Sequence, residues 1–70
     1  MKMSAPDVMA LARKFLRDEE ECEDPRLTSV EAIEPDSKWK VLANVGEVGV
    51  VRRELVIDDR DGKIVSYKQL

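Results

Sequence analysis

Histidine is absent from this sequence of 70 residues, and cysteine, phenylalanine, tyrosine and tryptophan occur once each. Without histidine the chain lacks the side chain that normally titrates near neutral pH, so no Ser-His or Cys-His nucleophile can form within it. The same shortage excludes a zinc site built from cysteine and histidine. Gly46, Gly49 and Gly62 do not have the spacing of a phosphate-binding glycine loop. We therefore expect no enzymatic activity, no cofactor and no metal ion.

Long apolar runs are also absent. No segment approaches the ~18 apolar residues that a membrane-spanning helix needs, and the polar start of the chain, through Asp7, lacks the apolar run of a signal peptide. The single cysteine, Cys22, cannot form an intramolecular disulfide, whereas small secreted domains usually contain several. These features predict a cytoplasmic protein that does not enter a membrane.

The composition is that of a folded domain. Hydrophobic residues make up 43% of the chain and charged residues 39%, and twelve basic residues nearly offset fifteen acidic ones. Disorder needs low hydrophobicity together with high net charge, so we expect one folded domain over residues 1–70. A net charge of −3, without an exposed aromatic set, argues against binding to nucleic acid.

Residues 5–20 are predicted to form a helix. Pro6 suits the first helical turn, with Ser4 or Ala5 as the cap, and Asp7 is favourable near the positive end of the helix dipole. Apolar residues then recur at three- and four-residue spacing and form one stripe, namely Val8, Leu11, Ala12, Phe15 and Leu16. This stripe predicts a helix that covers another element.

An acidic linker is predicted over residues 18–26. Six of the seven residues from Asp18 to Asp24 are acidic, Cys22 is the last apolar position expected on the helix, and Pro25 disfavours further helix. Such a cluster fits a solvated acidic cap, or a site for a hard cation that accepts oxygen ligands. We favour the solvated cap, because consecutive residues on a fraying helix point in different directions.

The remaining residues, 27–69, change to a period near two, which is typical of strands. Turn-forming residues separate the apolar runs at 35–37, 46–49 and 59–62. The predicted strands are 27–34, 39–45, 50–58 and 63–68. The expected fold class is α+β, with the N-terminal helix packed on one face of a three- or four-stranded antiparallel meander sheet.

One face of this sheet is predicted to remain in water. If Trp39 and Val41 point toward the helix, their neighbours along the strand point away from it. The candidate interaction face, which is mildly basic, consists of Lys38, Lys40, Leu42, Arg52, Glu54 and Lys68. Such a face can steer a charged partner toward the domain.

Three kinds of function are consistent with the residues. The first is a non-catalytic interaction module, which binds a protein partner or associates with itself as a homodimer. The second is a small-ligand-binding or sensory domain, with a pocket between helix and sheet lined by Phe15, Trp39 and Tyr67. The third is a carboxylate-based enzyme, which requires two acids that converge in a cleft. We favour the first.

From Leu27 onward, the sequence resembles the gas vesicle protein O family and, more loosely, PepSY-type domains. The resemblance rests on Ser29-Val30-Glu31-Ala32, on Trp39-Lys40-Val41-Leu42-Ala43, and on Arg53-Glu54-Leu55-Val56-Ile57-Asp58 leading into Asp61-Gly62-Lys63-Ile64-Val65-Ser66-Tyr67. It implies a helix before a sheet and an accessory or assembly protein that acts by contact. The chain departs from the gas vesicle pattern at Asn44-Val45-Gly46-Glu47, and it lacks the basic, tyrosine-containing tail.

Overall fold

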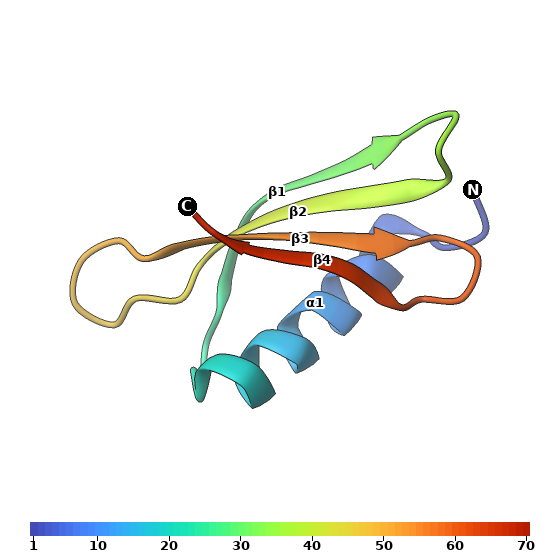
Figure 1. Ribbon diagram of the computed structural model, residues 1–70. Coiled ribbons are helices and arrows are strands. Elements are labelled where there is room, and N and C mark those ends of the chain that lie inside the picture. Colours follow the sequence, from blue (N-terminus) through green and yellow to red (C-terminus); the bar gives the residue numbers. More distant parts are fainter.

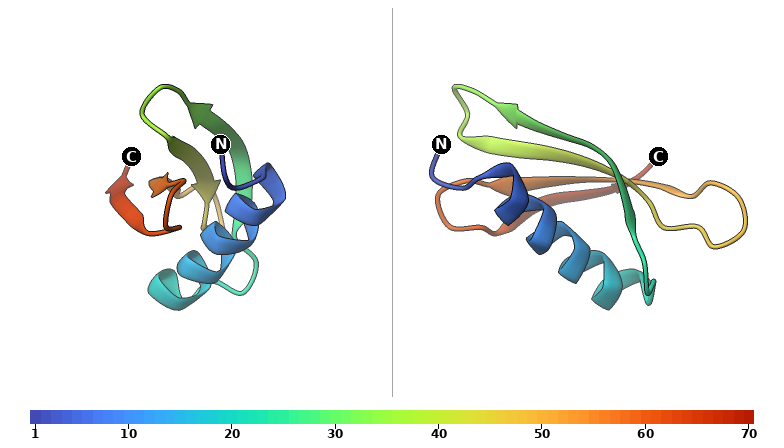
Figure 2. Two further views of the ribbon diagram at one scale, coloured as in Figure 1. Left: turned by 90° about the vertical axis from the view of Figure 1, so that its right-hand side faces the viewer. Right: turned by 180° about the vertical axis from the view of Figure 1, so that it is seen from behind.

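One helix and four strands follow one another in the computed structural model, which covers residues Met1–Leu70. The elements are α1 (Ala5–Glu20), β1 (Arg26–Ile33), β2 (Lys38–Asn44), β3 (Arg52–Asp58) and β4 (Ile64–Gln69). The strands lie in the order β1-β2-β3-β4, each antiparallel to its neighbour, and α1 crosses one face of the sheet (Figure 1, Figure 2). The predicted α+β meander is confirmed, with four strands. α1 is neither long enough nor apolar enough to span a bilayer.

The ends of α1 follow from local chemistry. Ser4 is the N-cap: its hydroxyl accepts from the backbone N–H of Asp7, and its own N–H donates to the Asp7 carboxylate. This reciprocal capping box satisfies two N–H groups that the first turn leaves without a helical partner. At the other end, Glu21 adopts a left-handed backbone conformation that terminates the helix.

The apolar stripe of α1 packs against β2 and β3. Val8, Ala12 and Leu16 are fully buried, whereas Leu11 and Phe15, at the margin of the stripe, are half-buried. The sheet contributes alternate residues to the same core, namely Trp39, Val41, Ala43, Leu55 and Ile57. Full burial of an aliphatic side chain contributes about 1.5–3 kcal/mol, so this layer supplies most of the favourable free energy of folding.

The bounds of α1 agree with the predicted helix, 5–20, and Cys22, which was expected to provide the last apolar position of the helix, lies two residues beyond its end. α1 ends at Glu20, because Glu21 turns the backbone, and Cys22 and Pro25 in the segment that follows are both buried. Cys22 is a free thiol and belongs to the hydrophobic core. The linker is therefore shorter than predicted and is anchored by two apolar residues.

β3 begins two residues later than the sequence predicts. Val50 and Val51 favour strand conformation, but both belong to the connection between β2 and β3, and Val50 is 67% exposed. The side-chain oxygen of Asn44 accepts from the N–H groups of Gly46 and Val51, each at 3.0 Å. A side chain thus takes the place of strand pairing at this end of the hairpin.

Asp59 ties the N-terminal segment to the sheet. Only 4% of this residue is exposed, and its carboxylate accepts from the Trp39 indole at 2.8 Å, from the N–H of Met3 at 2.9 Å and from the N–H of Lys2. Burial raises the pKa of Asp59, but the bonds from Lys2, Trp39 and Met3 outweigh burial, and the net pKa is lowered. The carboxylate therefore remains ionised at neutral pH and holds residues 2 and 3, just before α1, against the turn that follows β3.

We expect Asp59→Asn to lower the melting temperature at pH 7, because an amide offers one acceptor oxygen and brings an N–H group against the existing donors. The lowered pKa of Asp59 in the folded chain means that its contribution is present above the ordinary value of 3.8 and is lost as pH falls through the lowered value. The difference between the two proteins should therefore shrink in acid. Thermal unfolding followed by circular dichroism at pH 7 and pH 3 measures both effects. Asp36→Asn, at an exposed turn position, is the matched control, and equal melting temperatures at pH 7 would contradict the clamp.

Candidate functional site

The face of the sheet that points away from α1 has no element of the chain over it (Figure 1, Figure 2). We call this surface the open face. Its side chains alternate with the buried residues of β2 and β3, and the strand register extends it onto β1 and β4. By the strand register, the open face includes Ser29, Glu31, Ile33, Lys38, Lys40, Leu42, Asn44, Arg52, Glu54, Val56, Asp58, Ser66 and Lys68. All six residues of the sequence-predicted face lie on it.

The strand register places some of these six residues next to one another and others far apart. Leu42, Glu54 and Lys68 stand side by side across β2, β3 and β4. Lys40 lies one step along β2, opposite Val56. Lys38 and Arg52 occupy opposite ends of the face.

Among the residues of the open face that sequence reasoning missed, Glu31 and Val56 lie at its centre. Glu31 lies directly opposite Lys40, and Val56 adjoins both Lys40 and Ser66. The alternation along β3 already implied that Val56 points away from the core. Glu31 was harder to place, because the register of β1 shifts between Leu27 and Ser29. With Glu31 included, the centre of the face is balanced in charge and not basic.

A hollow of about 350 Å³ lies at one end of the open face. Leu42, Val50 and Leu70 supply apolar atoms to its lining, and Asn44 and Arg52 supply polar ones. A concave, partly apolar surface of this kind is typical of a site that takes a side chain from a partner.

The β2–β3 connection projects past this hollow as an exposed apolar tip. Figure 1 shows it extending beyond the rest of the sheet, and Val48 at its end is 97% exposed. Gly46 permits the tight path of the chain, since a Cβ atom there would lie 2.5 Å from the carbonyl oxygen of Gly49. Val48 and Val50 thus leave apolar side-chain surface in water at this tip.

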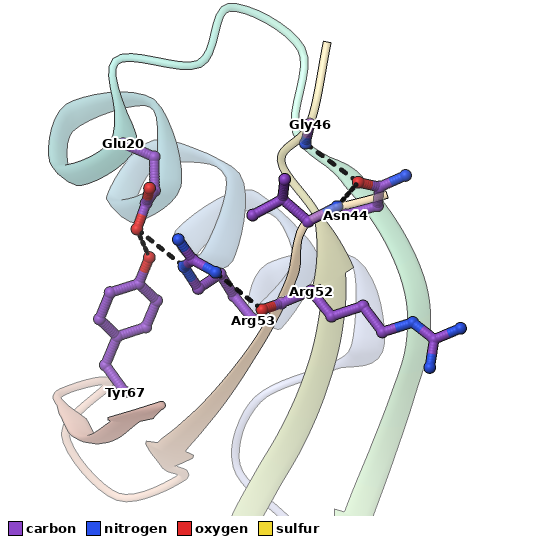
Figure 3. Close-up of polar contacts among 7 residues, drawn as sticks. Glu20, Asn44, Gly46, Arg52, Arg53 and Tyr67 are labelled. Carbon is purple, nitrogen blue, oxygen red and sulfur yellow. Dashed lines mark hydrogen bonds and ion pairs between the residues drawn. The ribbon is translucent and has the colours of Figure 1, made fainter. Parts of the chain in front are cut away.

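On the covered side, three polar residues fasten the end of α1 to the sheet. Glu20 accepts from Arg53 Nε at 3.1 Å, and the Tyr67 hydroxyl donates to the same carboxylate oxygen. Figure 3 shows these three side chains converging, while Arg52 points away toward the other side of the sheet. The bonds from Tyr67 and then Arg53 lower the pKa of Glu20. Burial, and then the bond to the Glu20 carboxylate, raise the pKa of Tyr67 to about 12.

The aromatic residues of the expected ligand pocket are occupied by contacts within the fold. Trp39 is 8% exposed and donates to Asp59, and the rings of Phe15 and Tyr67 meet edge to face with centroids 5.0 Å apart. The only hollow that Phe15 lines is a shallow one at the margin of α1, and neither Trp39 nor Tyr67 contributes to it. These three side chains act as packing and anchoring groups.

The acidic residues at the end of α1 do not converge. No group of three or more aspartate, glutamate or cysteine side chains is placed so that it could hold a metal ion. Glu20 instead pairs with Arg53. The structure thus brings together the charges of the open face and separates those of the linker.

Comparison of the chain with protein-family models, with curated proteins and with solved structures gave no match.

Because Tyr67 is the single tyrosine, its ionisation can be followed directly by ultraviolet absorbance. We expect a midpoint near pH 12, and we expect Glu20→Gln to move it toward the ordinary value of 10.0, since the neighbouring negative charge is removed. The raised pKa also means that the stabilising contribution of Tyr67 is complete below pH 10.0 and is lost as pH rises through about 12. Glu19→Gln, an exposed neighbour, is the control, and an unchanged midpoint in Glu20→Gln would refute the cluster.

Proposed function

We propose that this protein is a non-catalytic interaction module that binds another protein chain through the open face of its sheet. One observation carries the proposal: a four-stranded sheet is covered by a helix on one side only, and its other side combines half-buried apolar residues with charged ones. Leu42 and Val56 are the apolar residues at its centre, and Lys40 and Glu54 lie directly beside them. Binding surfaces commonly have an apolar centre within a polar rim.

The hollow at the end of this face supports the same proposal. Leu42 and Val50 both line it, and Val50 is two residues from the exposed Val48 in the same connection, which gives an apolar path toward the end of the hairpin. A partner that covers this path removes apolar area from water, which is the usual source of favourable binding free energy.

The state of the carboxylates also supports a role without catalysis. A general acid needs a raised pKa to hold its proton near neutral pH. The carboxylates whose pKa is displaced here, Glu20, Asp58 and Asp59, all have lowered values, and Asp58 reaches about 2 because Arg60 binds it. Each is held ionised by a structural partner.

We place this activity in the cytoplasm, since a free, buried thiol at Cys22 fits a reducing compartment. The resemblance to the gas vesicle protein O family suggests a specific form of the proposal, in which the domain is an accessory of a larger assembly. Vesicle shell and chaperone genes beside this gene would support that form, and other neighbours would oppose it.

The double variant Lys40→Glu/Arg52→Glu should weaken partner binding at least about tenfold, because charges arranged for a partner become repulsive to it. Both residues lie on the open face, and neither belongs to the core, so the circular dichroism spectrum should be unchanged. Affinity purification of the tagged chain from its native cells, with quantification of the co-purified proteins, measures the effect.

The matched control is Lys14→Glu/Lys63→Glu, which makes the same change in net charge away from the open face. A partner that is lost from the first variant and retained by the control supports the proposal. A partner that binds both variants as it binds the unmodified chain opposes it.

A further inference from the structure

We propose that the open face docks onto the open face of a second copy of this chain, around a two-fold axis that runs diagonally through Leu42 and Val56. This inference rests on the proposed function, because it uses the same surface, and it specifies the partner. It follows from the order in which charged and apolar residues alternate across the strands.

Four residues at the centre of the face form a checkerboard. Lys40 and Leu42 belong to β2, and Val56 and Glu54 stand directly opposite them on β3. The two apolar residues therefore occupy one diagonal of the square, and the two opposite charges occupy the other. All four side chains are half-buried, which keeps them in place on the sheet.

The outer strands continue the pattern of charge. Glu31 on β1 lies beside Lys40, and Lys68 on β4 lies beside Glu54. Each charge of the centre thus has an outer neighbour of opposite sign, and the two outer charges also differ in sign. The apolar diagonal has Lys40 and then Glu31 on one side, and Glu54 and then Lys68 on the other, counted outward from the diagonal. The signs of the charges are therefore reversed from one side to the other.

When two copies of a face meet around a two-fold axis in the plane between them, each residue meets the residue that lies across the axis in the other copy. With the axis along the apolar diagonal, Lys40 meets Glu54 of the second copy, and Glu31 meets Lys68 of the second copy. Symmetry repeats both contacts, which gives four attractive pairs. Leu42 and Val56 meet their own counterparts at the axis.

The four charges are free to make these contacts. The two ion pairs within the chain are Glu20–Arg53, under the helix, and Asp58–Arg60, in the turn after β3. Glu31, Lys40, Glu54 and Lys68 take part in neither of them.

The geometry agrees with known sheet packing. Neighbouring strands are about 4.8 Å apart and alternate residues about 6.7 Å apart, so the diagonal makes an angle of about 35° with the strands. A two-fold axis in that direction crosses the strands of the two copies at about 70°, which is near the orthogonal class of packed sheets.

A second copy also fits better than an acidic partner. A purely acidic surface would be attracted by Lys40 and Lys68 and repelled by Glu31 and Glu54, whereas the same face in a second copy satisfies all four. Four strands of about seven residues offer a contact of less than about 1,000 Å² in total, below the size of a stable interface. The dimer is therefore weak, forms at high micromolar concentration and dissociates in high salt.

Sedimentation equilibrium over a range of concentrations tests this arrangement with two single variants. Lys40→Glu places two glutamates opposite each other twice in the dimer, and Glu54→Lys does the same with two lysines. Each variant alone should dimerise at least about tenfold more weakly than the unmodified chain. An equimolar mixture of the two should dimerise like the unmodified chain, because both contacts then regain opposite charges.

Rescue in the mixture supports the diagonal arrangement, because repulsion or misfolding within one chain cannot be repaired by another chain. Circular dichroism and Trp39 fluorescence confirm that each variant is folded, and Lys14→Glu mixed with Glu47→Lys is the control outside the face. Dimers that persist in both single variants, or a mixture that stays monomeric, overturn the proposal. An unmodified chain that is monomeric at millimolar concentration also overturns it, even where Lys40→Glu/Arg52→Glu loses a different protein partner and the proposed function stands.

Discussion

Burial of one helix stripe against one side of the sheet is the contact on which the rest of this structure depends. Val8, Ala12 and Leu16 are fully buried, and they belong to the same hydrophobic core as the inward-facing residues of β2 and β3. The chain has 70 residues and forms four strands but only one helix, so the helix can cover only one side of the sheet. The opposite side of the sheet therefore remains in water, and its residues are free to be selected for contacts with other molecules.

Two polar clusters hold this helix in one position along the sheet. Asp59 fixes the segment before α1 through Trp39 and two backbone N–H groups, and Glu20 fixes the end of α1 through Arg53 and Tyr67. Both carboxylates have a lowered pKa and are ionised at neutral pH. These anchors fix the position of the helix on the sheet, whereas the pairing of the four strands fixes the spacing of side chains on the open face.

The fold could be predicted from the sequence because apolar residues recur at a helical spacing in one segment and at every second position in another. The spacing from Val8 to Leu16 indicated a helix with one apolar side, and the alternation from Trp39 to Val45 placed the lysines of β2 outside. The anchor at Asp59 could not be predicted, since it joins residues far apart in sequence. The place of Glu31 was hidden by the register shift near Thr28, and a shift of one residue decides which strand neighbours meet.

That single placement changes the kind of partner the surface fits. With Lys38, Lys40, Arg52 and Lys68 set against Glu54 alone, the face is basic and favours any acidic surface. Glu31 beside Lys40 balances the centre, and attraction then depends on the order of the charges more than on their sum. A surface attracts such a face only if its own charges are placed opposite charges of the other sign. Because the alternation on this sheet reverses across its own apolar diagonal, the matching surface is already encoded by the chain.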